Sequence, residues 1–118
     1  MIRHILFITF TDEASPEQIN AVRQAFLRIP RQVTGVTRVE WGINDSPEGK
    51  NAGHTHCVLM TFADEAARQH YLPHPAHDAL KSIFRPVLRD IVVLDFTLKP
   101  ESSAGWVNQR RAVCTEAH

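Results

Sequence analysis

The chain has 118 residues, enough for one domain that buries roughly two thirds of the surface of its unfolded form. Thirteen Lys and Arg balance thirteen Asp and Glu, so the broad attraction that drives nonspecific nucleic-acid binding is absent. The apolar runs are too short to span a membrane, and two cysteines, Cys57 and Cys114, form neither a disulfide framework nor a zinc ribbon. We therefore expect a cytoplasmic protein with reduced thiols that binds neither nucleic acid nor membranes.

The first part of the chain predicts a strand followed by a helix. Residues 2–10 carry apolar side chains on both alternating faces, which indicates a strand buried on both sides. Ser15, Pro16 and Gln18 form a capping-box pattern that begins a helix. The helix has one apolar stripe, made of Ile19, Val22, Phe26 and Ile29, and we expect it to stop at Pro30.

Two strands joined by a polar loop follow. Residues 37–44 alternate apolar and polar side chains, which is typical of an edge strand with one wet face. Residues 44–53 are rich in turn-forming residues and predict a connection. Residues 53–62 predict a strand in which His54 and His56 share a face, about 7 Å apart.

The second helix is expected in two pieces. Asp64 can cap a helix that runs to about Tyr71, after which Pro73 and Pro75 interrupt the hydrogen-bond ladder. Apolar residues then recur at helical spacing until Pro86. Residues 91–98 predict the last strand, flanked by Asp90 and with Asp95 near its other end, and residues 99–118 predict a tail.

The order of elements predicts an α+β fold. Strand, helix, strand, strand, helix, strand with right-handed crossovers gives a ferredoxin-like βαββαβ domain, in which a four-stranded antiparallel sheet carries both helices on one face. Three of the four strands are apolar on both faces, so the second face of the sheet would expose a large apolar surface. We expect a homodimer in which a second copy covers this open face and closes a dimeric α/β barrel.

Three segments resemble the stress-responsive A/B barrel family within the dimeric α/β barrel proteins. They are residues 2–7 with the early His4, residues 53–58 with His56, and Tyr71-Leu72-Pro73-His74-Pro75-Ala76-His77, a His-Pro-x-His signature. The resemblance covers about residues 1–98 and implies a homodimeric barrel. In polyketide-cyclising members the tyrosine and the final histidine of this signature act as an acid/base pair, which implies that Tyr71 and His77 are catalytic and that His4 and His56 line the pocket.

Several functions stay open at this point. One is cofactor-free acid/base chemistry, a cyclisation or isomerisation of a small carbonyl compound by a lyase or isomerase of the polyketide-cyclase kind, with His77 as base and Tyr71 as hydrogen-bond donor. A noncatalytic stress-related barrel that binds an apolar ligand is an alternative, and a cofactorless monooxygenase is a second one by analogy. His54 and His56 could share a metal, although no carboxylate stands at ligand spacing, and no cofactor fingerprint is present.

Overall fold

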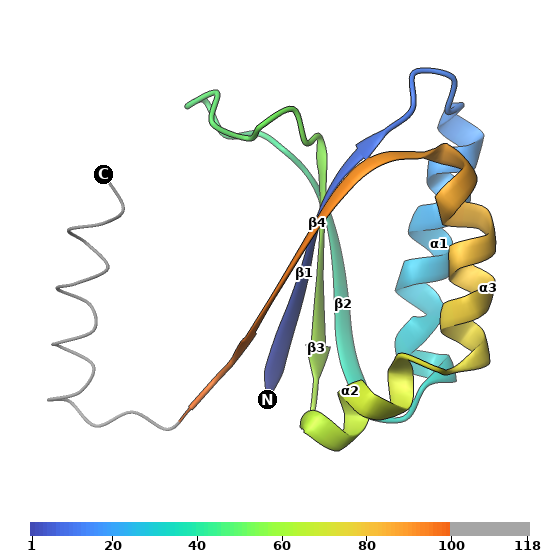
Figure 1. Cartoon of the computed structure of the whole chain (residues 1–118), viewed down its shortest axis with the longest axis vertical. Coiled ribbons are helices and arrows are strands. Elements are labelled where there is room, and N and C mark those ends of the chain that lie inside the picture. Colours follow the sequence, from blue (N-terminus) through green and yellow to red (C-terminus); the bar gives the residue numbers. More distant parts are fainter. Residues whose placement is uncertain (100–118) are drawn as a thin grey trace, which may run out of the picture.

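A four-stranded antiparallel sheet forms one layer of the molecule (Figure 1). The computed structural model describes residues 1–99, so the predicted tail from residue 100 onward lies outside the described residues. The central strands are β1 (Ile2–Phe10) and β3 (His56–Phe62), and the edge strands are β2 (Val36–Ile43) and β4 (Leu88–Thr97). The order β2-β3-β1-β4 confirms the predicted ferredoxin-like sheet.

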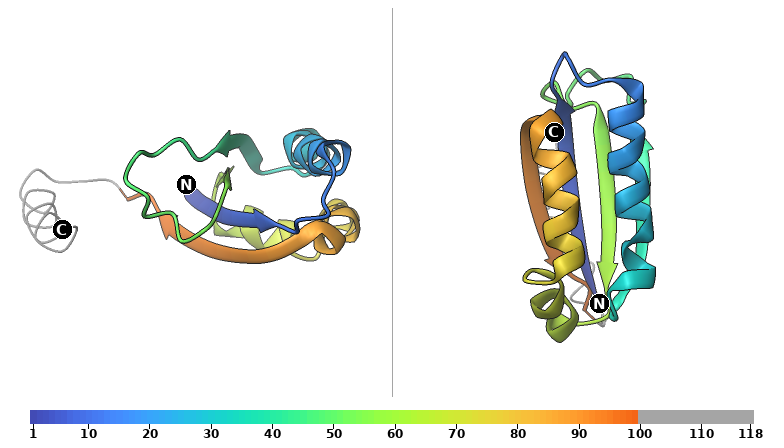
Figure 2. Two further views of the ribbon diagram at one scale, coloured as in Figure 1. Left: turned by 90° about the horizontal axis from the view of Figure 1, so that it is seen from above. Right: turned by 90° about the vertical axis from the view of Figure 1, so that its right-hand side faces the viewer.

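The helices form a second layer on one face of this sheet. They are α1 (Pro16–Gln32), α2 (Glu65–Tyr71), α3 (Pro75–Phe84) and a short 3-10 helix, η1 (Arg85–Val87). Figure 2 shows α1 and α3 side by side over the strands, and the predicted second helix is indeed two pieces, α2 and α3. The core lies between the layers, with Phe26, Ile29, Val58 and Met60 at most 1% exposed. Within residues 1–99, no helix is long and apolar enough to cross a membrane.

The limits of α1 follow its sequence signals at the start and depart from them at the end. The backbone N–H of Gln18 donates to Ser15 Oγ at 3.1 Å, and the backbone N–H of Ser15 donates to Gln18 Oε1 at 2.9 Å, which is the predicted capping box. The predicted stop at Pro30 is wrong, because the helix continues to Gln32. Proline lacks the N–H donor and crowds the carbonyl four residues earlier, but the N–H of Val33 after it still donates to the Ile29 carbonyl at 2.9 Å.

Two strands begin three residues away from the predicted start. We expected β3 to begin at Gly53, but it begins at His56, since Ala52 and Gly53 adopt left-handed backbone angles with φ of 53° and 81° that no strand contains. The last strand begins at Leu88 rather than at Ile91. Asp90 therefore lies inside β4 and not at its flank, and Asp95 lies inside it as well.

The face of the sheet that the helices leave open is apolar, as the strand patterns predict. On β4 it presents Val92, Leu94 and Phe96, which are 45%, 55% and 46% exposed. The register places Val92 beside Phe7 and Leu94 beside Ile5 of the central strand β1. Large apolar side chains therefore run together across neighbouring strands on this side, which we call the open face.

Candidate active site

A pocket of about 350 Å³ opens between α3 and the strands β1 and β4, on the helix side of the sheet. Its floor is formed by His4 and Leu6 of β1 and its far wall by Ile91 and Val93 of β4. Leu88 at the start of β4 also lines it, and the remaining lining residues come from the helices and their connections: Phe26, Tyr71, Leu72, His77, Leu80, Lys81, Phe84 and Arg85. Most of these side chains are apolar, so the few polar ones determine the chemistry that the pocket can support.

Tyr71 and His77 meet in this pocket because the helix breaks between them. Tyr71 is the last residue of α2, and α3 begins at Pro75, with His74 as its N-cap. The break turns the chain so that the rings of Tyr71 and His77 lie 4.4 Å apart between centroids and are tilted by 33°. The sequence signature thus places a phenol and an imidazole against each other at one pocket wall.

The hydrogen bond of His77 fixes which ring nitrogen is available. Its Nδ1 lies 2.9 Å from the carbonyl oxygen of Leu72. Because a carbonyl only accepts, Nδ1 carries the proton in the neutral ring, and Nε2 has the free lone pair. Burial lowers the pKa of His77, and the nearby Lys81 charge lowers the pKa further, while the Leu72 carbonyl opposes both effects. His77 is therefore in the form that can accept a proton at neutral pH.

Tyr71 is buried, and its ring and its hydroxyl have different surroundings. The residue is 1% exposed and packs against Phe62, with ring centroids 5.5 Å apart. Within residues 1–99 the Tyr71 hydroxyl makes no side-chain hydrogen bond, and no buried side-chain nitrogen or oxygen there lacks a partner. The hydroxyl must then reach the pocket space. Burial raises the pKa of Tyr71, so the phenol keeps its proton and can donate it in a hydrogen bond.

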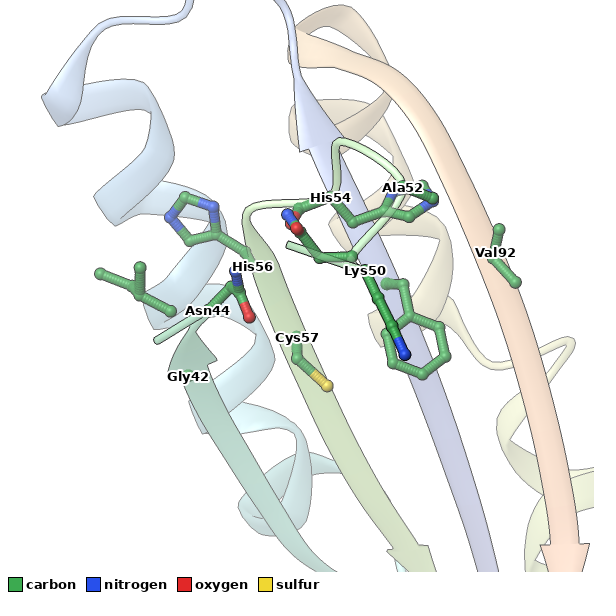
Figure 3. Close-up of a pocket in the computed structure, with 11 residues that line it drawn as sticks. Gly42, Asn44, Lys50, Ala52, His54, His56, Cys57 and Val92 are labelled. Atoms are coloured by element: carbon green, nitrogen blue, oxygen red, sulfur yellow. The ribbon is translucent and has the colours of Figure 1, made fainter. Parts of the chain in front are cut away.

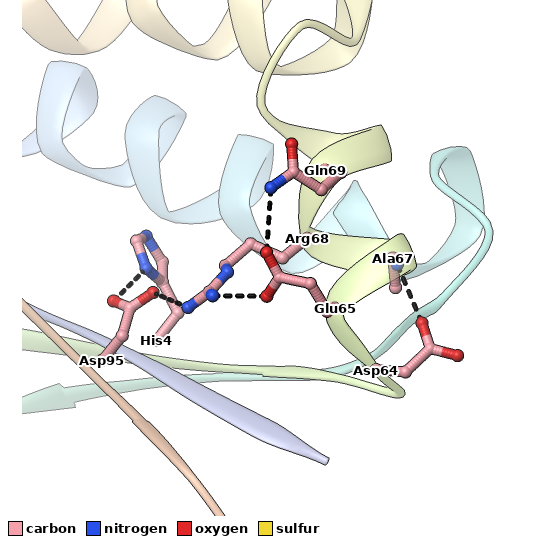
Figure 4. Close-up of polar contacts among 7 residues, drawn as sticks. All are labelled: His4, Asp64, Glu65, Ala67, Arg68, Gln69 and Asp95. Atoms are coloured by element: carbon pink, nitrogen blue, oxygen red, sulfur yellow. Dashed lines mark hydrogen bonds and ion pairs between the residues drawn. The ribbon is translucent and has the colours of Figure 1, made fainter.

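His4 reaches the same pocket and is held by a polar network that Figure 4 shows. Its Nδ1 lies 2.7 Å from Asp95 Oδ1, and the Arg68 guanidinium donates to Asp95 Oδ2 at 3.1 Å. Arg68 also pairs with Glu65 in the first turn of α2. Because the carboxylate accepts from Nδ1, the neutral His4 ring presents Nε2 as an acceptor.

The sequence predicted neither Asp95 nor Arg68 as part of the site, and named Asp95 only for its place near the end of the last strand. Asp95 interrupts the apolar run of residues 91–96, which is a signal that its carboxylate has a partner. That partner depends on the register of β1 against β4, in which His4 lies opposite Asp95. The sequence alone does not fix this register.

His56 does not join His4, Tyr71 and His77. It shares their side of the sheet, but it lies opposite Ile8, four residues along β1 from His4, which corresponds to about 13 Å. Its ring packs edge-on against Phe10 at 4.9 Å and beside Trp41 at 5.4 Å. His56 instead lines a second pocket near the loop between β2 and β3 (Figure 3). Burial lowers its pKa.

The expectation that His54 and His56 project from one face is wrong. Residue 54 lies in the turn before β3, and its ring lies 6.4 Å from Phe7 on the open face, whereas His56 packs against Phe10 on the helix face. In the described part of the chain no group of three or more His, Cys, Asp or Glu side chains could hold a metal ion. Besides Lys81 and Arg85, the polar side chains that line the candidate site are the imidazoles of His4 and His77 and the phenol of Tyr71.

The sequence comparison settles the family. The family model of the Stress responsive A/B Barrel Domain (Dabb) matches residues 2–98, nearly the whole described chain. The protein belongs to the Dabb family. The match agrees with the resemblance seen in the three sequence segments and with the observed ferredoxin-like sheet.

Two curated relatives are similar over most of this Dabb chain. The stress-response A/B barrel domain-containing protein HS1 of Arabidopsis thaliana is 31% identical over 101 residues, which are 86% of this chain and 91% of HS1. The olivetolic acid cyclase of Cannabis sativa is 25% identical over 96 residues, which are 81% of this chain and 95% of the cyclase. One relative is thus named for a stress response and the other for a ring-closing reaction.

Solved structures of similar proteins share this fold, and one of them is a dimer. A dimeric ferredoxin-like protein of unknown function from Thermobifida fusca superposes with a TM-score of 0.70 at 27% identity, covering 82% of this chain and 90% of that one. The hydroxynitrile lyase of Passiflora edulis superposes with a TM-score of 0.78 at 23% identity, covering 86% and 95%, and shows the fold alone. Proteins similar to this one thus include a cyclase and a dimer, and a lyase shares the fold.

Proposed function

We propose that the pocket of His4, Tyr71 and His77 carries out cofactor-free acid/base chemistry on a small carbonyl compound, a cyclisation or isomerisation of the lyase or isomerase type. The observation that supports it is the contact of Tyr71 with His77, 4.4 Å between ring centroids, at the wall of an apolar pocket of about 350 Å³. One group there can accept a proton and the other can donate a hydrogen bond.

His77 acts as the general base in this proposal. The Leu72 carbonyl holds the proton on Nδ1, so the Nε2 lone pair can remove a proton from the carbon next to the substrate carbonyl. The lowered pKa keeps the ring neutral near pH 7. The base is therefore ready without any change in protonation before substrate binds.

Tyr71 stabilises the charge that this step creates. Removal of the α-proton moves negative charge onto the carbonyl oxygen, and a phenol whose pKa is raised by burial donates a hydrogen bond without losing its proton. His4, fixed by Asp95, lines the same pocket and binds the polar end of the substrate. His56 has no part in this reaction, since it lies at the other pocket.

The protein works as a homodimer in which a second copy covers the open face. The support is the cluster of exposed apolar side chains on β4 and the dimeric state of the similar protein from Thermobifida fusca. Leu94→Arg, in the middle of this face, is expected to give a monomeric mass in light scattering. Ile83→Arg is the control, because Ile83 is also exposed but belongs to α3 on the helix side. A dimer that survives Leu94→Arg contradicts this interface.

Proton exchange tests the chemistry without knowledge of the natural substrate. Simple alkyl ketones in D₂O exchange their α-protons slowly, and ¹H NMR measures the protein-catalysed increase. His77→Gln should reduce that increase by about 100-fold or more, the usual contribution of a general base. His70→Gln is the matched control, since His70 is exposed on α2 and does not line the pocket. An unchanged rate in His77→Gln removes His77 from the mechanism, and ketone binding without exchange by the wild type indicates a noncatalytic ligand-binding barrel.

A further inference from the structure

The pocket of Tyr71 and His77 continues along α3 to a positively charged end. His77, Lys81 and Arg85 all line it and recur at intervals of four residues. The backbone N–H of Arg85 still donates to the Lys81 carbonyl, so the helical geometry extends to this residue. Side chains four residues apart lie on one helix face, and the row spans about 12 Å between its first and last Cα atoms. The proposed base thus stands at one end of the row and a guanidinium at the other.

The last residue of this row, Arg85, has a guanidinium that the described residues leave unpaired. Lys81 pairs with Asp78, with 3.2 Å between Nζ and Oδ1. In contrast, within residues 1–99 the Arg85 guanidinium forms no ion pair and no side-chain hydrogen bond. None of the described Asp or Glu residues lines the pocket. The Arg85 end can therefore bind an anionic group of a ligand.

The Asp95 carboxylate lies toward the other end of the pocket. The backbone N–H of Leu88, the first residue of β4, donates to the Arg85 carbonyl, which places the start of this strand next to Arg85. Asp95, which is bound to His4, lies seven residues further along the strand, a distance of about 23 Å. An anionic group is therefore attracted to the Arg85 end and away from Asp95.

The two ends of the pocket together select the chemistry of its substrate. The lining between them is apolar and includes Leu80 and Phe84 of α3. A guanidinium presents two parallel N–H groups, which match the two oxygens of a carboxylate. We propose that the substrate is a keto acid whose carboxylate binds Arg85 while its carbonyl lies at Tyr71 and His77. Its apolar carbons pack against the lining between these groups. The assignment rests on the proposed acid/base function of the pocket.

The compounds 6-oxoheptanoate and 6-oxoheptanamide are suitable probes because they differ in charge and hardly in shape. In D₂O, ¹H NMR follows the exchange of the protons next to the ketone. The wild type should exchange the keto acid with a kcat/KM about tenfold or more above that of the amide, since only the carboxylate forms a charge-assisted hydrogen bond with the guanidinium. Equal values for the two compounds overturn the proposal.

A pair of arginine variants separates a binding site from general charge. Arg85→Met removes the guanidinium and should lower the preference for the keto acid over the amide by about tenfold. Arg89→Met makes the same change in net charge, but Arg89 pairs with Asp12 at 3.1 Å and lines neither described pocket, so the preference should persist. A preference that persists in Arg85→Met, or that falls equally in both variants, shows that Arg85 binds no carboxylate.

Heptanoate, which has no ketone, tests the carboxylate site separately from the chemistry. In a ¹H–¹⁵N NMR titration of the full chain, it should shift the amides of Lys81 and Arg85, and Arg85→Met should weaken its binding about tenfold or more. If neither keto probe exchanges and heptanoate still binds in this way, the acid/base function fails and the carboxylate site stands. The absence of shifts up to tens of millimolar heptanoate, or an equal affinity in Arg85→Met, overturns the site.

Discussion

Tyr71→Phe separates a functional hydroxyl from a structural one. Loss of a functional hydroxyl should leave the free energy of unfolding almost unchanged, whereas loss of a structural one should lower it. The ring is 1% exposed and packs against Phe62 and His77, so the apolar contacts of the ring hold this part of the core. The hydroxyl, in contrast, has no side-chain hydrogen bond within residues 1–99. Removing the oxygen alone should change the free energy of unfolding by no more than ~0.5 kcal/mol, the range of substitutions that break no native contact.

Tyr71→Ala provides the scale for this measurement. Loss of the whole buried ring leaves a cavity and should cost about 3–5 kcal/mol. Urea unfolding followed by far-UV circular dichroism measures both variants against the wild type. A loss of ~1.5 kcal/mol or more in Tyr71→Phe would refute the reasoning, since it would mean that the hydroxyl is bonded inside the fold. A stable Tyr71→Phe that exchanges ketone α-protons about 100-fold more slowly is the result that the proposed donor role requires.

Three further outcomes follow from the same geometry. Tyr71 is the one tyrosine of the chain, so the absorbance of tyrosinate at 295 nm reports it alone. Because burial raises the pKa of Tyr71, the native protein should show no tyrosinate at pH 10. The free energy of unfolding should fall as the pH rises past 10, because only the unfolded state releases that proton. Half-protonation at pH 10 contradicts this. In ¹H–¹⁵N NMR, the neutral ring of His77 should carry its proton on Nδ1, and an Nε2 proton contradicts the assignment. The pKa of His77 should lie below 6.5, so the free energy of unfolding should fall as the pH drops through 6.5 toward the folded-state pKa. Gly35→Ala should cost ~2 kcal/mol in urea unfolding, since its φ is +95° and an added Cβ would lie 2.5 Å from a neighbouring side chain, while Gly42→Ala, with open space, should cost much less; equal costs would contradict the role of Gly35.

The elements that local signals encode were predictable, and those that need tertiary information were not. The capping box at Ser15 and the Asp64 cap begin their helices where predicted, because each cap depends on residues within one turn. The start of β3, in contrast, was predicted three residues too early. His54 and Thr55 alternate like strand residues, but the left-handed turn at Ala52, held by hydrogen bonds to Thr9 and within the loop, delays the strand to His56.

The site divides in the same way. Tyr71 and His77 are six residues apart, so the sequence signature itself brings them together. The family resemblance implied that His4 and His56 line one pocket, and both do face the helices, yet the antiparallel register separates them along the strands by four residues. The Asp95 carboxylate that holds His4 comes from a strand 91 residues away in the chain, and only the β1–β4 register reveals it. Side-chain facing is a local property, whereas position along a strand pair is not.

The break between α2 and α3 sets the tautomer of the proposed base. In an uninterrupted helix the Leu72 carbonyl would accept the N–H four residues later, that of Ala76. Here the Ala76 N–H instead donates to Nδ1 of His74, the N-cap of α3, at 2.9 Å. The Leu72 carbonyl is thereby left for Nδ1 of His77, which directs Nε2 away from the backbone. The prolines and His74, none of which needs to touch a substrate, thus explain why His77 can present a lone pair beside Tyr71.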